Sequence, residues 1–409
     1  MSKHIKFNVI IPTRERADTL YHCLRTIVSQ KYDNLDIIVS DNYSQDNTRE
    51  IVASFSDSRI KYINTGKRIS MSHNYAFALN HVSDGWVTII GDDDGLLPGA
   101  LAKIANVIQK MGCKAVASKW CYYYWPHCTA QENHLIVPLK SGIELRNGRE
   151  WLGKLMRGDA VYPDLPFLYT GGFVDIEAIN RARDGSGSFF LSMTPDVYSA
   201  IALASVLDSY VMLMEPVTVG GVSTHSTGAS CLGVGDNIKP SNMFFSEGNI
   251  PFHHTLVGGE VVKSIPIIVY ESYLQAIHLH HDYLGIRLED QLGLALANIS
   301  PQYYDNLRRY CTEIAFNNKI LMSDVDRKFK VFNRKFKKRE LLRLILWFIR
   351  PEHLDFDGNE LGLQNVFDAA LVANAVLVSN KTYQHRKRKM ILSLIKKIAQ
   401  RVSDIVRRK

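Results

Sequence analysis

Three adjacent aspartates are the residues of this chain whose spacing most clearly suggests chemistry. Asp92, Asp93 and Asp94 lie between two glycines and follow the apolar run Val87–Ile90. Neighbouring carboxylates repel one another, and each is driven toward protonation unless a positive charge lies close by. Mg²⁺ and Mn²⁺ provide such a charge, because both prefer hard oxygen ligands and bridge diphosphates. The triplet is also compatible with a solvated acidic turn that has no catalytic role.

Two further polar segments follow apolar runs in the same way. Pro12–Arg16 comes after Phe7–Ile11, and polar groups beside a helix N-terminus are suited to holding a nucleotide or phosphate. A simple turn capped by Thr13 explains this segment equally well. Asp41–Thr48 begins with a carboxylate that can accept hydrogen bonds from a base or ribose. An ordinary Asx-rich loop is the alternative for this segment.

The elements that position these segments alternate along the first 110 residues between short apolar runs and helical spacing. Such alternation predicts an α/β fold with a mostly parallel central sheet covered by helices. Ligands of these folds bind at the carboxyl ends of the strands, where the polar segments lie. We predict strands at Phe7–Ile11, Leu35–Val39, Ile60–Ile63 and Trp86–Ile90, and helices at Ala17–Gln30, Asp46–Phe55, Ser70–His81 and Pro98–Met111.

Together, these segments resemble the family 2 glycosyltransferases of the GT-A fold. The resemblance covers residues 5–110 closely and extends more loosely to residue 230. It rests on the order and spacing of four motifs rather than on any one of them. These are Pro12-Thr13-Arg14, Asp41-x-x-Ser44-x-Asp46-x-Thr48, Asn74-x-x-x-Ala78-x-Asn80, and Asp92-Asp93-Asp94-x-Leu96-x-Pro98-x-x-Leu101.

The resemblance implies an inverting transferase that uses a nucleotide-diphospho-sugar, with UDP-sugars favoured, and Mn²⁺ or Mg²⁺. Gly91 stands where many relatives have another Asp, which leaves open which aspartate ligates the metal. The resemblance implies Asp92, Asp93, Asp94 and His225 as metal ligands. It implies nucleotide-sugar contacts at Pro12, Thr13, Arg14, Arg16, Asp41, Asn42, Lys67, Arg68, Asn74, Asp92 and Asp93.

Inverting relatives also need a general base about a hundred residues after the acidic cluster, to deprotonate the acceptor hydroxyl. Their usual Glu-Asp pair is absent here, and Asp196 in Thr194–Tyr198 takes its place as the predicted catalytic residue. A first-turn acid favoured by the helix dipole is the alternative interpretation of Asp196. The other candidates for the base are Asp159, Asp164 and Asp175.

Some other polar residues have weaker signals. His225 lies in a polar loop, where most histidines bind no metal. His253-His254 fall in a segment rich in Gly, Asn, Ser and Pro, and an acceptor or lid role is one interpretation of them. The Thr170–Gly172 segment either lets the main chain approach the acceptor closely or forms an ordinary turn.

The C-terminal third differs in composition from the rest. The net charge is +8, and basic residues are concentrated in 327–350 and 381–409. Basic amphipathic helices of this kind either lie on anionic membranes or pack as a bundle with a solvated face. No nucleic-acid-binding module is recognisable. We predict a GT-A domain at 1–235, a linker or mobile loop at 236–265 and a basic helical region at 266–409.

The sequence therefore predicts a metal-dependent transferase that moves a sugar to a glycan or lipid-linked acceptor in capsule, lipopolysaccharide or cell-wall synthesis. Neither a signal peptide nor a membrane span is recognisable. We expect a cytoplasmic protein that is peripheral at the inner face of the plasma membrane. The alternatives are a nucleotidyltransferase, which needs a Gly-rich loop after the first strand, and a non-catalytic scaffold recruited to membranes. The sequence does not determine the oligomeric state.

Overall fold

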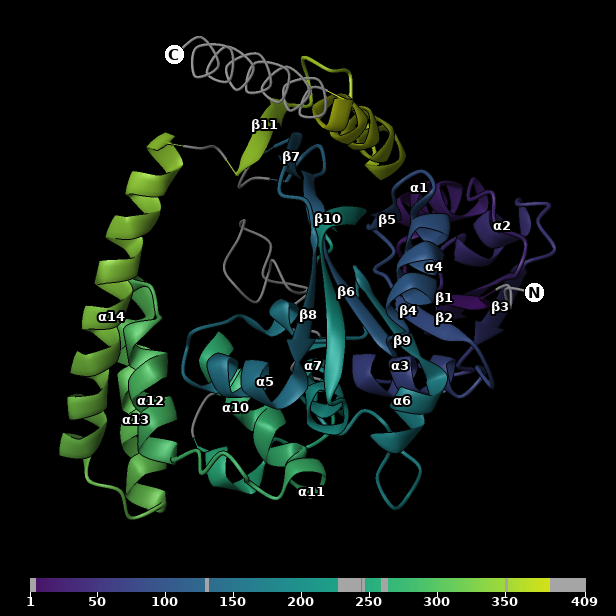
Figure 1. The fold of residues 1–409 in the computed structure, drawn as a ribbon. Helices are drawn as coiled ribbons and strands as arrows, with labels where there is room; N and C mark the ends of the chain where they lie inside the picture. The colour runs from purple at the N-terminus through teal and green to yellow at the C-terminus, as the bar shows by residue number, and fades with distance from the viewer. Residues whose placement is uncertain are drawn as a thin grey trace, which may run out of the picture.

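A computed structural model describes residues 5–128, 132–226, 244, 247–258, 264–349 and 352–382, with the main chain alone at 341–349. Its centre is a single twisted sheet with helices against both faces (Figure 1). Among the described residues, no helix combines the length and hydropathy needed to cross a bilayer.

The four predicted strands form the parallel half of the sheet. Their order is β3-β2-β1-β4, with every neighbouring pair parallel. Thr13 pairs with Asp41 at the ends of β1 and β2, so the two predicted nucleotide segments leave the sheet side by side. The strands are β1 (Phe7–Thr13), β2 (Leu35–Asp41), β3 (Ile60–Asn64) and β4 (Trp86–Ile89).

Beyond β4 the sheet becomes mixed. Strand β9 runs antiparallel to both β4 and β6, whereas β10 runs parallel to β6. The prediction of an α/β fold is confirmed, but parallel pairing dominates only the N-terminal half of the sheet. The remaining strands are β5 (Gly95–Leu96), β6 (Ala115–Tyr124), β7 (His134–Pro138), β8 (Ile143–Asn147), β9 (Gly172–Asp175), β10 (Ser209–Val222) and β11 (His353–Asp357).

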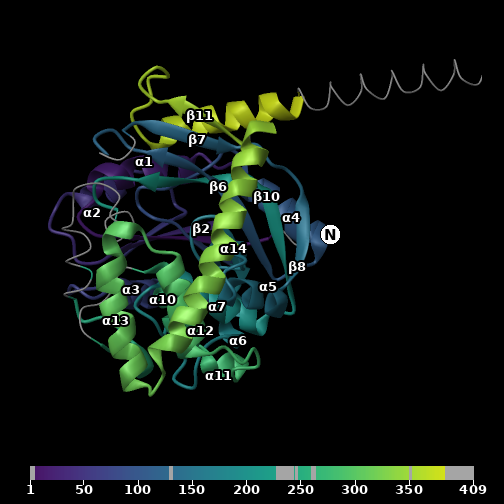
Figure 2. The ribbon, with the colours of Figure 1, turned by 90° about the vertical axis from the view of Figure 1, so that its left-hand side faces the viewer.

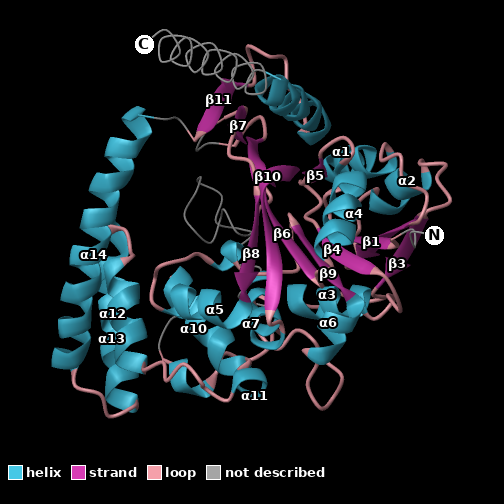
Figure 3. Ribbon diagram, in the orientation of Figure 1, coloured by secondary structure: helices cyan, strands magenta, loops and turns pink. Residues whose placement is uncertain are grey.

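Alternate residues of the central strands pack in two different cores, because successive side chains of a strand point to opposite faces of the sheet. In β1, Val9 and Ile11 pack with one set of helices, and Ile10 packs with the other. The first set is α1 (Ala17–Val28), α2 (Thr48–Ala53) and α4 (Ala100–Met111). The second set includes α3 (Met71–Leu79), α5 (Gly148–Met156), α6 (Ile176–Arg181) and α7 (Pro195–Val206) (Figure 3).

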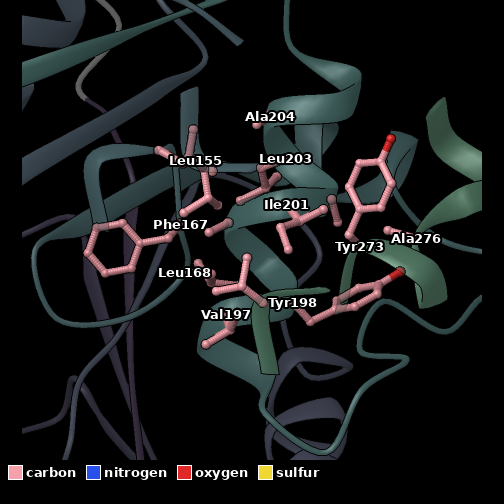
Figure 4. Packing of buried hydrophobic residues seen from close by; sticks show 14 of the residues in the cluster. Leu155, Phe167, Leu168, Val197, Tyr198, Ile201, Leu203, Ala204, Tyr273 and Ala276 are labelled. Carbon is pink, nitrogen blue, oxygen red and sulfur yellow. The ribbon is translucent and has the colours of Figure 1, made fainter. Parts of the chain in front are cut away.

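The helices after residue 264 extend the second core. Figure 4 shows Tyr198 and Ile201 of α7 packed with Tyr273 and Ala276, which lie at the end of α10. The predicted boundary at 265 therefore does not separate two cores. The helices are α10 (Ile265–Gln275), α11 (Ile277–His280), α12 (Leu288–Ala297), α13 (Tyr304–Asn317) and α14 (Met322–Ile349), with short 3₁₀ turns η1 (Tyr162–Asp164), η2 (His254–Leu256) and η3 (Pro301–Tyr303).

The chain then returns to the sheet, which the sequence did not predict. Strand β11 adds to the edge by antiparallel pairing with β7. A helix follows at residues 366–382 and packs Val366, Ala369 and Ala373 in a third core with Tyr123 of β6. Helix α14 lies against α12 and rises from the α13–α14 turn toward this edge (Figures 1 and 2). The C-terminal region is thus helical for most of its described length but also contributes an edge strand.

Candidate active site

The acidic loop lies where β4 ends at the carboxyl edge of the parallel strands. The side chains of Asp92, Asp93 and Asp94 are all buried, at 2%, 4% and 3% exposure. This burial excludes the solvated acidic turn. Each carboxylate is held by a different part of the chain, so the loop is fixed from three sides.

Asp92 faces the first loop. Thr13 donates a hydrogen bond to its Oδ2 at 2.7 Å, and Arg16 donates to its Oδ1 at 2.9 Å. Burial raises the pKa of Asp92, although Arg16 opposes that rise. The first polar segment and the acidic loop are therefore one site, as the sequence predicted.

Asp93 faces the end of β10. Ser223 and Ser226 donate to its Oδ2 at 2.7 and 2.5 Å, and Trp125 donates to its main-chain carbonyl at 3.1 Å. No hydrogen bond from the described residues reaches Oδ1 of Asp93. That oxygen remains able to bind a cation or a ligand hydroxyl.

Asp94 is held by main-chain amides and by Thr170. The main-chain amides of Gly91 and Gly221 donate to it at 2.8 and 2.7 Å, and the Thr170 hydroxyl donates to it as well. Burial and the charge of Asp93 together raise the pKa of Asp94 to about 7. Asp94 is therefore fixed by the protein on both oxygens.

The structure explains why residue 91 is glycine. A Cβ there would lie 2.8 Å from the Tyr169 hydroxyl and 2.9 Å from Oδ2 of Asp94. An aspartate at this position, as many relatives have, would displace both groups. The acidic cluster of this chain thus begins at Asp92.

The second polar segment packs beside the end of β3. Asp41, which is buried, accepts hydrogen bonds from Tyr62 at 2.5 Å, Asn64 at 3.1 Å and the Ser44 amide at 2.9 Å. Asn42 forms a pair of hydrogen bonds with the main chain of Ile69. Together these contacts hold the loop that contains Lys67 and Arg68 against the end of β2.

The other residues predicted to contact the nucleotide have different partners in the structure. Pro12 lies within β1, opposite Ser40. Arg14 pairs with Glu247, and Arg68 pairs with Glu15 at 2.8 Å. Asn74 accepts from the Ser40 hydroxyl at 2.7 Å and donates to its carbonyl, so its side chain joins α3 to β2.

Asp196 opens α7 across the site from the acidic loop. Tyr162 donates a hydrogen bond to its Oδ2 at 2.9 Å, and burial raises the pKa of Asp196 although that hydrogen bond opposes the rise. Burial is the largest cause that raises the pKa of the Tyr75 hydroxyl, and the charges of Asp196 and Asp94 raise it further. Burial and the same two charges also raise the pKa of the Tyr169 hydroxyl. Tyr75 and Tyr169 therefore lie near both the predicted base and the acidic loop.

The three alternative bases have structural partners elsewhere. Asp175 caps α6 and pairs with Lys114. Asp164 pairs with Lys119, and Asp159 pairs with Lys335 of α14. These ion pairs leave Asp196 as the candidate that faces the acidic loop.

The predicted histidines contribute less to the candidate site than the aspartates do. His225 is exposed, and its main-chain carbonyl accepts from Arg16. His253 caps the turn η2 through its side chain, and half of the predicted linker at 236–265 lies outside the described residues. Thr170 contacts Asp94, so the Thr170–Gly172 turn belongs to the site.

The donor set fits a divalent cation. Of the three buried carboxylates, only that of Asp92 forms an ion pair with a described residue, Arg16, so negative charge is in excess. Within the described part of the chain, no group of three or more acidic, His or Cys side chains is arranged to enclose a metal. Mg²⁺ and Mn²⁺ sites often have only one or two carboxylates and use substrate phosphates for the rest. Asp93, through its Oδ1, is the side chain best placed for this role.

Sequence reasoning missed several residues of the site. Tyr162, Tyr169 and Ser223 come from segments without a strong pattern, and only chain folding brings them to the aspartates. A signal that was present is the run Ser223–Ser226, which is rich in hydroxyls and follows a long apolar stretch.

The fold and the acidic loop define an α/β domain of the GT-A class. Residues 8–160 match Glycosyl transferase family 2, and these residues are a family 2 glycosyltransferase domain. The family predicted from the four motifs is thereby confirmed for this part of the chain.

Individual relatives are similar over part of the chain. The GalNAc(5)-diNAcBac-PP-undecaprenol beta-1,3-glucosyltransferase of Campylobacter jejuni is 37% identical over 24% of this chain and 33% of its own length. An Escherichia coli UDP-Glc:alpha-D-GlcNAc-diphosphoundecaprenol beta-1,3-glucosyltransferase is 28% identical over 29% of this chain and 45% of its own length. The chain thus spans less than half the length of either relative. The solved structure of Staphylococcus aureus TarS 1–349 aligns over 82% of this chain and 92% of that one, with 14% identity and a TM-score of 0.42.

Proposed function

We propose that this protein is an inverting, metal-dependent glycosyltransferase that moves a sugar from a UDP-sugar to a glycan or lipid-linked acceptor in surface polysaccharide synthesis. The observation that carries the proposal is the presence of three buried carboxylates at the end of β4 together with Asp196, with Tyr75 and Tyr169 close to both. The names of the two relatives, which both specify undecaprenol-linked glycans, support the acceptor class.

The donor is held by the carboxyl edge of the parallel strands. Asp41, with Tyr62 and Asn64 beside it, accepts hydrogen bonds from the base or ribose. Arg16 and the Lys67-Arg68 loop contribute positive charge near the diphosphate. The bound Mn²⁺ or Mg²⁺, held through Asp93, supplies charge that stabilises the departing nucleotide diphosphate.

The acceptor hydroxyl is activated by Asp196. Its carboxylate takes the proton as the acceptor oxygen bonds to the anomeric carbon, and the bond from that carbon to the diphosphate oxygen breaks. Attack from the face opposite the leaving group inverts the anomeric configuration. The Tyr162 hydroxyl holds Asp196 in place while the proton is transferred.

We also propose that α14 brings the enzyme to anionic membranes. Its exposed side chains include Arg327, Lys330, Arg334, Lys337 and Lys338, which recur at helical spacing and form one basic stripe. Such stripes bind anionic lipid surfaces. A lipid-linked acceptor would be reached from that position. Residues 383–409 of the basic segment at 381–409 lie outside the described residues.

The test is a transfer assay with the purified full-length chain. The assay combines UDP-glucose or another UDP-sugar with Mn²⁺ and a synthetic lipid diphosphate that carries one N-acetylglucosamine. We expect UDP release that EDTA abolishes, and a product of inverted anomeric configuration by NMR. A chain that releases nucleotide from no sugar donor is instead a non-catalytic scaffold.

A further inference from the structure

Strand β6 presents a row of side chains that starts at the acidic loop. Trp120 and Tyr122 share one face of the strand, because side chains alternate with a period of two. Ser118 precedes them, and the pairing of β6 with β10 is irregular between Ser118 and Trp120. Ser118 donates to the carbonyl of Gly171 at 3.0 Å, and the preceding residue, Thr170, contacts Asp94. The row therefore runs outward from the proposed metal site.

The next two members of the row are aromatic and accessible. The ring centroids of Trp120 and Tyr122 are 5.7 Å apart, at an interplanar angle of 59°. Phe167 packs on the far side of Trp120, at 6.0 Å between centroids. Tyr122 keeps 40% of its surface exposed. These contacts hold two aromatic rings at a fixed tilt, with one side open to solvent.

Gly220 of β10 lies directly beside this pair. It is the register partner of Tyr122, and a Cβ on it would lie 3.0 Å from Cδ1 of Trp120. A larger residue at 220 would press on the indole ring. Glycine thus leaves room for the ring where β10 passes β6.

The aromatic pair also adjoins the proposed base. Burial and the charge of Asp196 are the main causes that raise the pKa of Tyr162, and the charge of Tyr122 adds to them. Tyr162 in turn donates to Asp196. Tyr122 therefore lies near Tyr162, the residue that holds the proposed base.

We propose that Trp120 and Tyr122 form the acceptor subsite, on which the pyranose ring of a glycan stacks so that its hydroxyl reaches Asp196. The proposal rests on the proposed function. The C–H face of a pyranose is apolar and its rim is polar, so it suits exposed aromatic rings edged by hydrogen-bonding groups. Tyr162 provides such an edge group.

The experiment separates acceptor binding from donor chemistry. Hydrolysis of the UDP-sugar with no acceptor is measured first, and KM for acceptors is then measured on a panel of mono- and disaccharide diphospholipids. We expect Tyr122→Ala to raise the acceptor KM about threefold to tenfold and to leave donor hydrolysis unchanged. Trp120→Phe, which keeps an aromatic ring, should retain more acceptor affinity than Trp120→Leu.

A matched control is Tyr303→Ala, because Tyr303 has the same 40% exposure but lies on η3, in the C-terminal helical region. An unchanged acceptor KM in both Tyr122→Ala and Trp120→Leu would overturn the subsite. An enzyme that cleaves the donor but transfers to no glycan would overturn it too. A wild-type chain that cleaves no donor would instead overturn the proposed function.

Discussion

Gly221 of β10 lies directly against the main-chain carbonyl of Asp93, so that a Cβ on residue 221 would stand 1.9 Å from that oxygen. Its amide also donates to Asp94 at 2.7 Å. The close contact joins the loop after β4 to a strand more than a hundred residues later in the chain. The acidic loop is therefore shaped as much by β10 as by its own sequence.

We expect Gly221→Ala to damage the site through this contact. The added methyl group meets main-chain atoms that cannot rotate away, and such overpacking costs about 2 kcal/mol. Donor-dependent activity should fall sharply, and Tm should drop in differential scanning calorimetry. Gly185→Ala is the control, because a Cβ at residue 185 meets no atom within 4 Å. Equal effects from both substitutions would contradict the proposed packing.

Asp93→Asn should remove metal-dependent turnover with little loss of stability. The Ser223 and Ser226 hydroxyls can reorient toward an amide, whereas the negative charge offered to a cation is lost. We expect UDP release at least about 100-fold slower, with Tm near that of the wild type. Asp84→Asn, at an exposed acid, is the control. Normal rates in Asp93→Asn, with an unchanged Mn²⁺ requirement, would remove Asp93 from the metal site.

Asp196→Asn should lose turnover while it keeps nucleotide binding. An amide cannot accept the acceptor proton, and loss of a general base costs about 100-fold to 10,000-fold in rate. The nucleotide segments lie at the ends of β1, β2 and β4 and are untouched by this change. UDP binding by calorimetry should therefore match that of the wild type. An Asp196→Asn enzyme that turns over normally would move the base elsewhere.

The acid limb of the pH–rate profile should follow Asp196. Burial raises its pKa, and only its ionised form acts as a base, so the rate falls as pH drops through a value higher than that of an exposed aspartate. Tyr162→Phe removes a hydrogen bond that favours the ionised form. The pKa should rise further, and the acid limb should move to higher pH. A limb that stays in place or moves to lower pH would show that Tyr162 does not act on the base.

Neutralising the stripe on α14 should weaken binding to anionic vesicles. Each basic side chain near such a surface contributes about 1 kcal/mol, so a triple change to Gln should weaken binding about 100-fold. Sedimentation with phosphatidylglycerol vesicles measures this effect. The changes are Lys330→Gln, Arg334→Gln and Lys337→Gln, with Lys31→Gln, Lys110→Gln and Lys140→Gln as the control set.

Equal vesicle binding by the two triple variants would show that α14 does not form the contact. Donor hydrolysis should be the same in both, because neither set touches the site. Loss of binding at high salt would support an electrostatic contact over an apolar one.

The parallel half of the fold was predictable because its signals are local. The runs around Ile10, Ile38 and Ile89 are apolar and short, and the helices between them show a clear apolar face. Polar segments that follow such strands must meet at one edge of a parallel sheet. The contact of Asp92 with Thr13 and Arg16 follows from that rule.

The far half of the sheet was not predictable in this way. Strand β11 is short, partly polar and largely exposed, and only pairing with β7 makes it a strand. The mixed order around β9 and β10 depends on contacts between distant segments. Sequence periodicity contains no information on which edge such a strand will join.

The sequence by itself determined the family and the place of the acidic loop, because four motifs fall at the ends of locally encoded strands. Only the tertiary structure decided which groups surround those acids. Gly221 and Ser223 reach Asp94 and Asp93 through the course of β10, and Tyr162 reaches Asp196 through the packing of η1 on α7. These partners are set by long-range packing, which depends on the shape of the whole core rather than on any local pattern.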